Sequence, residues 1–237
     1  MSKTLSEQVP EALTVLYLRL NGFMTSGLVL HSDVKGNTRG DVDCLAVRFP
    51  HHDQRERGVG PDKYLRLSSI TECLICEVKS STTNISFNKP IREQDEAVDQ
   101  LLRWLGFVEA KELSTVVPNV RQLLQDGVTA AVAQDGLTHR DVRIRAVFAC
   151  PSCQFDENKQ LDRWILYGDW MISYIRECLV ADAPRQDCAT KYSCDIWGSY
   201  LEPLVDYFKT LPKKEEPSLK GLTVHVLKAW EGDANTE

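Results

Sequence analysis

The apolar residues between positions 7 and 149 change their spacing in a fixed order, and this order limits the folds open to the chain. Apolar residues three and four apart mark two helices, and apolar runs typical of strands mark four further segments. The order is helix, three strands, helix, strand, over residues 7–21, 28–30, 42–49, 73–79, 91–105 and 142–149. It predicts an α/β fold with a mixed central sheet flanked by helices.

The apolar pattern is less regular beyond Cys150. It favours a strand over residues 164–167, helices over residues 170–179 and 196–209, and a last strand over residues 222–227. We therefore expect a core over residues 1–149 and a mainly helical extension, residues 150–237, that packs on it.

The composition is that of an ordinary globular protein, with 43% hydrophobic and 26% charged residues. The net charge of -6 argues against an extended, nonspecific nucleic-acid coat, which would be basic. It allows a localised basic groove beside an acidic site. The first residues lack the apolar run of a signal peptide, and no stretch approaches the roughly 20 apolar residues that a membrane span needs. We therefore expect a cytoplasmic protein.

Acidic residues stand at the ends of two predicted strands. Asp41 and Asp43 are two residues apart and would share one face at the start of their strand, and Glu77 and Lys79 would share a face at the end of theirs. If these strands pair, three carboxylates and one lysine converge. Carboxylates that converge repel one another unless a cation lies between them, and hard oxygen ligands suit Mg²⁺ or Mn²⁺. The alternative is that all four are ordinary turn and edge residues.

The same residues carry a resemblance to the PD-(D/E)xK, or restriction-endonuclease-like, nuclease superfamily. Its core runs helix, three strands, helix, strand; its aspartate opens the second strand and its Glu-x-Lys ends the third. Residues 40–47 and 74–80 look like the corresponding segments of the resolvase-like members, and residues 20–23 look like the end of their first helix. The proline that names the motif is absent before Asp43, and residues 49–65 are longer and more charged than in small members.

The resemblance implies a metal-dependent endonuclease that hydrolyses phosphodiester bonds in DNA, in preference to RNA. It implies that Asp43 and Glu77 hold Mg²⁺ or Mn²⁺ and that Lys79 positions the attacking water. Asp41, and Glu11 in the first helix, would be additional metal ligands; the alternative for Glu11 is an exposed first-turn glutamate that is favourable to the helix dipole. Gln100 and Trp104 resemble the Gln-x-x-x-Tyr element of the RecB-like branch, in which the glutamine amide could hold a phosphate or the neighbour of the attacking water. The alternative is an exposed glutamine next to core residues Leu101 and Leu102.

Basic residues around the predicted site are candidates for phosphate contacts, because lysine and arginine supply the salt-dependent part of nucleic-acid affinity. They are Lys35, Arg39, Arg48, Lys89 and Arg92. Scattered surface charge is the alternative for each of them. The acidic chain and its extension suggest a nuclease that works with a protein partner or as a homo-oligomer. Family habits favour bacterial antiphage defence or DNA processing.

Two other classes of function stay open. One is a nuclease-like fold kept as a scaffold or nucleic-acid-binding subunit without catalysis. The other is an interaction protein stabilised by zinc, since the Cys-Pro-Ser-Cys sequence could form a zinc knuckle. The four candidate ligands are Cys150, Cys153, Cys188 and Cys194, and their spacing is wider than usual.

Overall fold

The fold is built on one mixed sheet of six strands, in the order β1-β2-β3-β5-β4, with β6 also pairing with β5. The computed structural model describes residues 4–32, 34, 37–53, 58–159, 161–180, 194–212 and 214–234. The strands are β1 (Met24–His31), β2 (Thr38–Arg48), β3 (Thr71–Val78), β4 (Leu137–His139), β5 (Val142–Cys150) and β6 (Ile165–Tyr167). The pairs β1–β2, β2–β3 and β4–β5 are antiparallel, whereas β3 and β6 each run parallel to β5. The predicted α/β class with a mixed sheet is confirmed.

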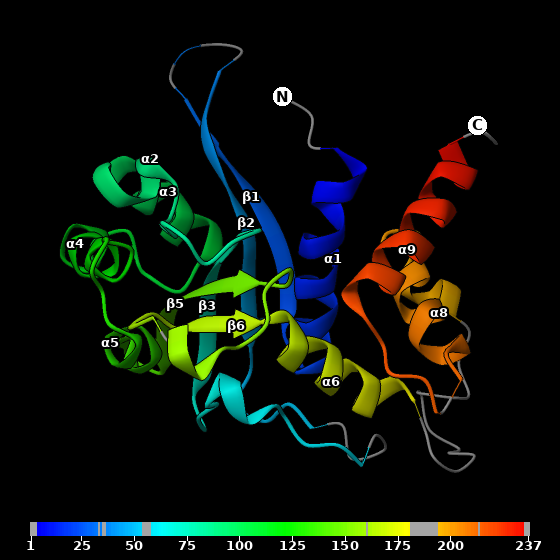
Figure 1. Ribbon diagram of the computed structural model, residues 1–237. Helices are drawn as coiled ribbons and strands as arrows, with labels where there is room; N and C mark the ends of the chain where they lie inside the picture. The colour runs from blue at the N-terminus through cyan, green and yellow to red at the C-terminus, as the bar shows by residue number, and fades with distance from the viewer. Residues whose placement is uncertain are drawn as a thin grey trace.

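Helices cover both faces of this sheet (Figure 1). One face carries α1 (Leu5–Leu20), α6 (Gly168–Leu179), α8 (Glu202–Thr210) and α9 (Leu219–Ala234), which share one core cluster. The other face carries α2 (Lys89–Glu93), α3 (Asp95–Leu105) and α4 (Leu113–Leu123), which share a second cluster, the α3–α4 cluster. The short α5 (Ala130–Asp135) precedes β4. The two clusters show why residues 73–76 of β3 and 146–150 of β5 are apolar: both faces of the sheet are covered there.

Helix α1 is fixed in place at its start and along one side. Thr4 and Glu7 form a capping box, in which the Thr4 amide donates to Glu7 Oε2 at 2.7 Å. Leu13, Leu16 and Tyr17 are fully buried in the cluster that α1 shares with the sheet and α6. Burial of such side chains contributes about 1.5–3 kcal/mol each. The helix is therefore held firmly beside the strands that carry the acidic residues.

The end of β3 that lies away from the acidic residues is joined to β5 by buried charges. Glu72 and Arg145 are both fully buried, and Arg145 Nη2 lies 2.9 Å from Glu72 Oε2. Arg143 also donates to this carboxylate, with its Nη2 2.5 Å from Oε1. Arg145 lies over the Trp164 ring, 4.7 Å from its centroid, and burial lowers the pKa of Arg145 to about 10.

Several boundaries differ from the sequence predictions. The predicted helix over residues 91–105 is interrupted at Gln94, whose extended backbone separates α2 from α3. The predicted strand over residues 222–227 is wrong, because these residues lie inside α9. Leu222 and Val226 are four apart and both fully buried, which is the spacing of a helix face. The extension is mainly helical, as expected, although its strand β6 joins the central sheet.

None of the helices in the described part of the chain combines the length and the apolar character that crossing a bilayer requires.

Candidate active site

Asp43 lies at an irregularity of β2. The pairing of β1 with β2 shifts register so that two residues, Asp43 and Cys44, oppose the single residue Gly27. The flanking pairs are Ser26 with Leu45 and Leu28 with Val42. Such a bulge inserts one residue into a strand and re-aims the side chains around it. Consistent with this, Val42 and Leu45 both pack in the α3–α4 cluster although they are three positions apart, a spacing that would place them on opposite faces of an unbroken strand.

The bulge brings the Asp43 carboxylate to the end of β3. Asp43 Oδ2 accepts a hydrogen bond from the backbone amide of Val78 at 2.8 Å. The backbone pairing of β2 with β3 ends at Cys44 and Cys76. The hydrogen bond from the Val78 amide to the Asp43 side chain connects the two strands beyond this last pair. The aspartate of one strand is therefore fixed beside the Glu-Val-Lys end of the other.

Glu77 is a buried carboxylate whose two oxygens have different surroundings. Only 2% of the residue is exposed. Its Oε1 accepts from Lys79 Nζ at 2.8 Å, while its Oε2 is buried and has no hydrogen-bond partner among the described residues. Burial raises the pKa of Glu77 to about 7; the Lys79 contact opposes this shift, and Asp43 and Asp41 add to it. An unmatched buried carboxylate oxygen is costly, and a cation would stabilise it.

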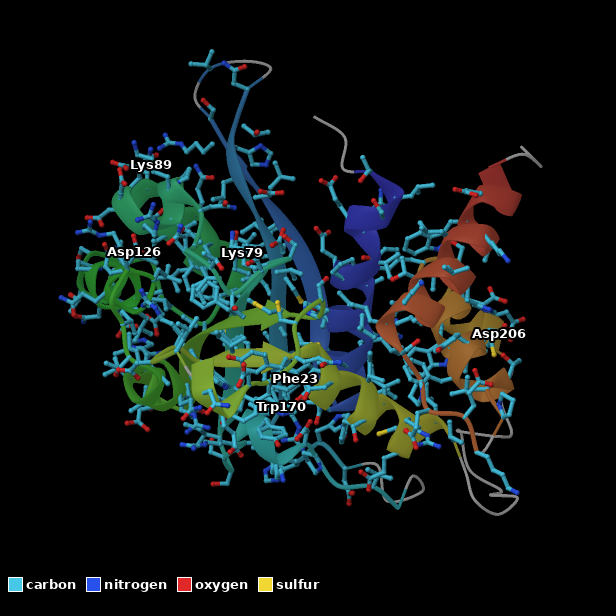
Figure 2. The ribbon with its side chains drawn as sticks, in the orientation of Figure 1. Phe23, Lys79, Lys89, Asp126, Trp170 and Asp206 are labelled. Atoms are coloured by element: carbon cyan, nitrogen blue, oxygen red, sulfur yellow. The ribbon has the colours of Figure 1, made fainter. Side chains whose placement is uncertain are left out.

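Lys79 follows β3 and stays next to β5. Its amide donates to the Ala149 carbonyl at 2.8 Å, and its side chain is 29% exposed. In Figure 2 it lies between α1 on one side and α2 and α3 on the other. Lys79 thus places an ammonium group at the surface of the sheet end, where a ligand from solvent can reach it.

The predicted acidic residues line one cleft of about 420 Å³. Helix α1 contributes Glu7, Pro10 and Glu11, and the strand ends contribute the remaining acidic groups and the lysine: Asp41, Asp43, Glu77 and Lys79. Asp43 and Glu11 are both near Cys44, where they add to burial in raising the pKa of that thiol to about 12. The structure therefore brings together all five residues predicted for catalysis and metal binding.

Asn88 also lines the cleft and was not predicted from the sequence. Its Nδ2 donates to the Asp41 carbonyl at 2.6 Å and lies 3.3 Å from Asp41 Oδ1. Asn88 is the N-cap of α2, a role that asparagine followed by a proline two residues later does suggest. The contact with Asp41 joins residues distant in sequence, so no local pattern could reveal it.

The donors in the cleft fit a divalent cation, although they do not enclose one as they stand. Among the described residues, no three His, Cys, Asp or Glu side chains form a ready cluster for a metal ion. Glu77 Oε1 is engaged by Lys79, and Asp43 Oδ2 is engaged by Val78. The unmatched Glu77 Oε2 and the surrounding carboxylates are nevertheless the hard oxygen donors that Mg²⁺ and Mn²⁺ take.

Gln100 lies outside the cleft. Its Oε1 accepts from the His31 amide at 2.9 Å, and its Nε2 donates to the His31 carbonyl at 3.1 Å. Both halves of the amide are therefore used on the backbone of the edge strand β1. This pairing covers part of an open sheet edge, which is otherwise prone to bind other strands.

Most of the basic residues predicted to contact nucleic acid are occupied by the protein itself. Arg48 is buried and donates to the Asn21 and His52 carbonyls. Arg92 donates to the Phe87 carbonyl and to Asp126, and Arg39 donates to the His31 carbonyl and to Gln94. Lys89 is well exposed, with 74% of its side chain accessible, and lies on the outer rim in Figure 2. Lys35 lies outside the described residues.

The candidate zinc ligands are only partly described. Cys150 and Cys153 lie together in a turn after β5, and Cys150 belongs to the α3–α4 cluster. Cys194 instead packs against the cluster of α1 and α8, and Cys188 lies outside the described residues.

Comparison with known proteins gives no match: no family model, curated protein or solved structure resembles this chain closely enough to be recognised.

Proposed function

We propose that the protein is a metal-dependent nuclease that hydrolyses phosphodiester bonds, with DNA as its preferred substrate over RNA. The observation that carries the proposal is the cleft in which Asp43, Glu77 and Lys79 meet at the ends of two adjacent strands. The resemblance of these residues to the PD-(D/E)xK pattern supports the same function. The buried and unmatched Glu77 Oε2 supports a cation as the missing partner.

Each residue of the cleft would have its own role in metal binding and hydrolysis. Asp43 and Glu77 would hold Mg²⁺ or Mn²⁺, with Asp41 and Glu11 as further oxygen donors in the same cleft. When bound, such an ion polarises a phosphoryl oxygen and lowers the pKa of a bound water. Asn88 orients Asp41, and the Val78 amide orients Asp43. These two hydrogen bonds preorganise the carboxylates before substrate arrives.

Lys79 would act on the reacting phosphate. Its ammonium is near the solvent and is paired with a single oxygen of Glu77, at 2.8 Å. An ammonium at this position stabilises the negative charge that develops on the phosphoryl oxygens and orients the attacking water through its donors. The Glu77 contact keeps the lysine side chain directed into the cleft when no substrate is bound.

The charge of the chain bears on how nucleic acid would be held. The net charge is -6, and Arg39, Arg48 and Arg92 are engaged in internal contacts. Neutralised phosphates supply most of the affinity of nonspecific binding, and the described surface near the cleft offers few cations for it. We propose that a protein partner or a second copy supplies further contacts, as in antiphage defence or DNA-processing assemblies.

A cleavage assay tests the proposal. The purified chain is incubated with supercoiled plasmid, linear duplex, single-stranded DNA and RNA, each with Mg²⁺, Mn²⁺ or a chelator. We expect metal-dependent cleavage of DNA that is lost in Lys79→Ala. Cleavage that persists in the chelator or in the variant would contradict the assigned site.

The second candidate is a nuclease-like scaffold without catalysis. The lack of a ready three-residue metal cluster among the described residues is the observation that favours it. Thermal melting with and without Mn²⁺ separates the two: a nuclease should melt at higher temperature with Mn²⁺, whereas a scaffold without a metal site should not respond.

A further inference from the structure

The Cys150-Pro151-Ser152-Cys153 sequence forms a tight turn at the end of β5. The Cys153 amide donates to the Cys150 carbonyl at 3.0 Å, which is the closing bond of a β-turn. Such a turn keeps its first and last Cα atoms within about 7 Å, and proline is favoured at its second position. Disulfides usually join Cα atoms that are roughly 4.4–6.8 Å apart. The turn thus brings the Cα atoms of the two cysteines to a separation that a disulfide can span.

Both thiols contact the segment that follows Lys79. Cys150 Sγ lies 3.8 Å from the Ser81 carbonyl oxygen, and Cys153 Sγ lies 3.7 Å from that of Ser80. As S–H donors they are weak hydrogen-bond partners of these carbonyls. Ser80 and Ser152 also line the acidic cleft. A change in the bonding of the two sulfurs would therefore alter the contacts of Ser80, which lines the cleft and directly follows Lys79.

The turn is seated against the start of α6. The Gly168 amide donates to the Cys153 carbonyl at 2.8 Å. A Cβ atom on Gly168 would lie 1.9 Å from the Pro151 carbonyl oxygen, a distance that no side chain tolerates. Glycine at this position therefore lets the helix and the turn approach closely. The backbone around both cysteines is held in place, so the two sulfurs stay near each other.

The two cysteines differ in access. Cys150 is fully buried, whereas Cys153 is partly exposed. Burial, followed by the neighbouring Cys153, raises the pKa of Cys150 to about 12, so this sulfur is a poor first nucleophile. An oxidant from solvent therefore meets Cys153 first, and Cys150 is placed behind it as the second sulfur.

We propose that Cys150 and Cys153 form a reversible disulfide at the rim of the acidic cleft. The oxidant is a small disulfide such as glutathione disulfide. The Cys153 thiolate attacks one sulfur of the oxidant, forms a mixed disulfide and releases one glutathione thiolate. The Cys150 sulfur, on losing its proton, then attacks the Cys153 sulfur and releases the second glutathione. The protein loses two hydrogens, and the oxidant is reduced to two thiols.

The disulfide also regulates the cleft, and this consequence rests on the proposed nuclease function. Oxidation removes both S–H donors, so the Ser80 and Ser81 carbonyls lose their sulfur partners. The segment that carries Lys79 then shifts relative to β5. Small displacements of a catalytic group lower rates by about 10-fold to 100-fold. Oxidised protein is therefore the less active form, and a dithiol reductant restores it.

Peptide mapping tests the disulfide without any assay of activity. The full-length protein is equilibrated in glutathione buffers from reducing to oxidising, free thiols are alkylated under denaturing conditions, and the protein is digested with trypsin. Residues 146–159 form one tryptic peptide that contains both cysteines. We expect this peptide to lose two hydrogens in oxidising buffer and to recover them in reducing buffer. A peptide that stays alkylated at both cysteines, or that links to another cysteine, overturns the proposal.

Two variants and a metal analysis complete the test. Cys153→Ser should keep the fold, since the side chain is partly exposed, and should lose any redox response of cleavage. Cys194→Ser, at the other partly exposed cysteine of the described residues, is the matched control and should respond as wild type. One zinc ion per chain that is lost in Cys153→Ser would instead identify these thiols as metal ligands and overturn the proposal. If the disulfide forms but neither redox state cleaves nucleic acid, the proposed nuclease function fails and the disulfide stands.

Discussion

Lys79 Nζ lies 2.8 Å from Glu77 Oε1, and this ion pair satisfies only half of a buried carboxylate. The other oxygen, Oε2, is buried without a hydrogen-bond partner among the described residues. Lys79 opposes the rise in the Glu77 pKa, yet burial outweighs it and the pKa stands at about 7. Near neutral pH without a cation, Glu77 therefore either keeps a proton or bears an incompletely compensated charge, which a divalent ion in the cleft would stabilise.

The first prediction is that Glu77→Gln removes a pH-dependent loss of stability. The pKa of Glu77 rises from 4.5 to about 7 in the folded protein, so the folded state keeps a proton that the unfolded chain has released in this window. The free energy of unfolding therefore falls as pH rises from about 4.5 to about 7, by roughly 3 kcal/mol in total. Urea unfolding across this range, with a chelator present, measures the difference between wild type and Glu77→Gln.

Glu93→Gln is the matched control for this experiment, because Glu93 is an exposed glutamate that pairs with Lys89 at 3.8 Å. It should follow the wild-type pH dependence. Above the window, Glu77→Gln should unfold at a higher urea concentration than wild type. Identical pH profiles for wild type and Glu77→Gln would show that Glu77 is not destabilised by burial.

The second prediction is that Asp43→Ala, Glu77→Ala and Lys79→Ala each lower metal-dependent cleavage by at least about 100-fold. In the proposed mechanism the two carboxylates would hold the ion and the lysine would stabilise charge at phosphorus, so each variant would remove part of one unit. Doubly substituted variants should be little worse than single ones for the same reason. Initial rates of plasmid cleavage in Mn²⁺ measure the effect.

Metal binding separates the roles of these residues. Lys79→Ala should still show an increase in melting temperature with Mn²⁺, whereas Asp43→Ala and Glu77→Ala should show little. Lys111→Ala is a control for lost positive charge, since Lys111 is exposed and contacts only Glu109 among the described ion pairs. If Glu77→Ala cleaves as well as wild type, Glu77 is not a metal ligand.

The core of this site was predictable because strand geometry is local. The strand spacing of Asp41, Asp43, Glu77 and Lys79, together with the order of helices and strands, predicted that they would meet, and they line one cleft. The bulge opposite Gly27 was not predictable, because it depends on how two strands pair rather than on either strand alone. Asn88 was missed because its contact with Asp41 spans much of the chain.

The contacts of the basic residues could not be predicted from the sequence. A sequence marks Arg48 and Arg92 as charged, and charge suggests a surface position. In the structure both guanidinium groups donate to backbone carbonyls, which long side chains reach only after the chain has folded. Residues 222–227 fit a strand in sequence because a short apolar run does not distinguish a strand from a helix; the full length of α9 does.

The third prediction is that Gln100→Ala weakens the β1 edge without affecting catalysis. Loss of the two bonds to the His31 backbone, at 2.9 Å and 3.1 Å, should cost about 1 kcal/mol and speed hydrogen exchange at His31. The cleavage rate should not change, because Gln100 lies outside the cleft. A variant that keeps full stability and loses cleavage would return Gln100 to the phosphate-contacting role that its sequence position suggested.

The fourth prediction concerns the buried ion pair at the far end of β3. Glu72→Ala leaves Arg145 fully buried without its counter-charge, and breaking such a pair costs about 3–5 kcal/mol. Glu72 also accepts hydrogen bonds from Ser68 and Arg143, so these partners lose their acceptor too. Chemical denaturation should show a much lower free energy of unfolding than for wild type.

Replacing both members of this pair tests the cause of that loss. Glu72→Leu combined with Arg145→Met removes both charges and keeps an apolar contact, so it should recover part of the stability that Glu72→Leu alone loses. Glu109→Ala, which breaks an exposed contact with Arg140 at 2.8 Å, should change stability little. If Glu72→Ala is no less stable than Glu109→Ala, the pair does not hold β3 to β5. The position of Glu77 at the opposite end of β3 would then have to depend on the backbone pairing of β3 with β5 and on the apolar core.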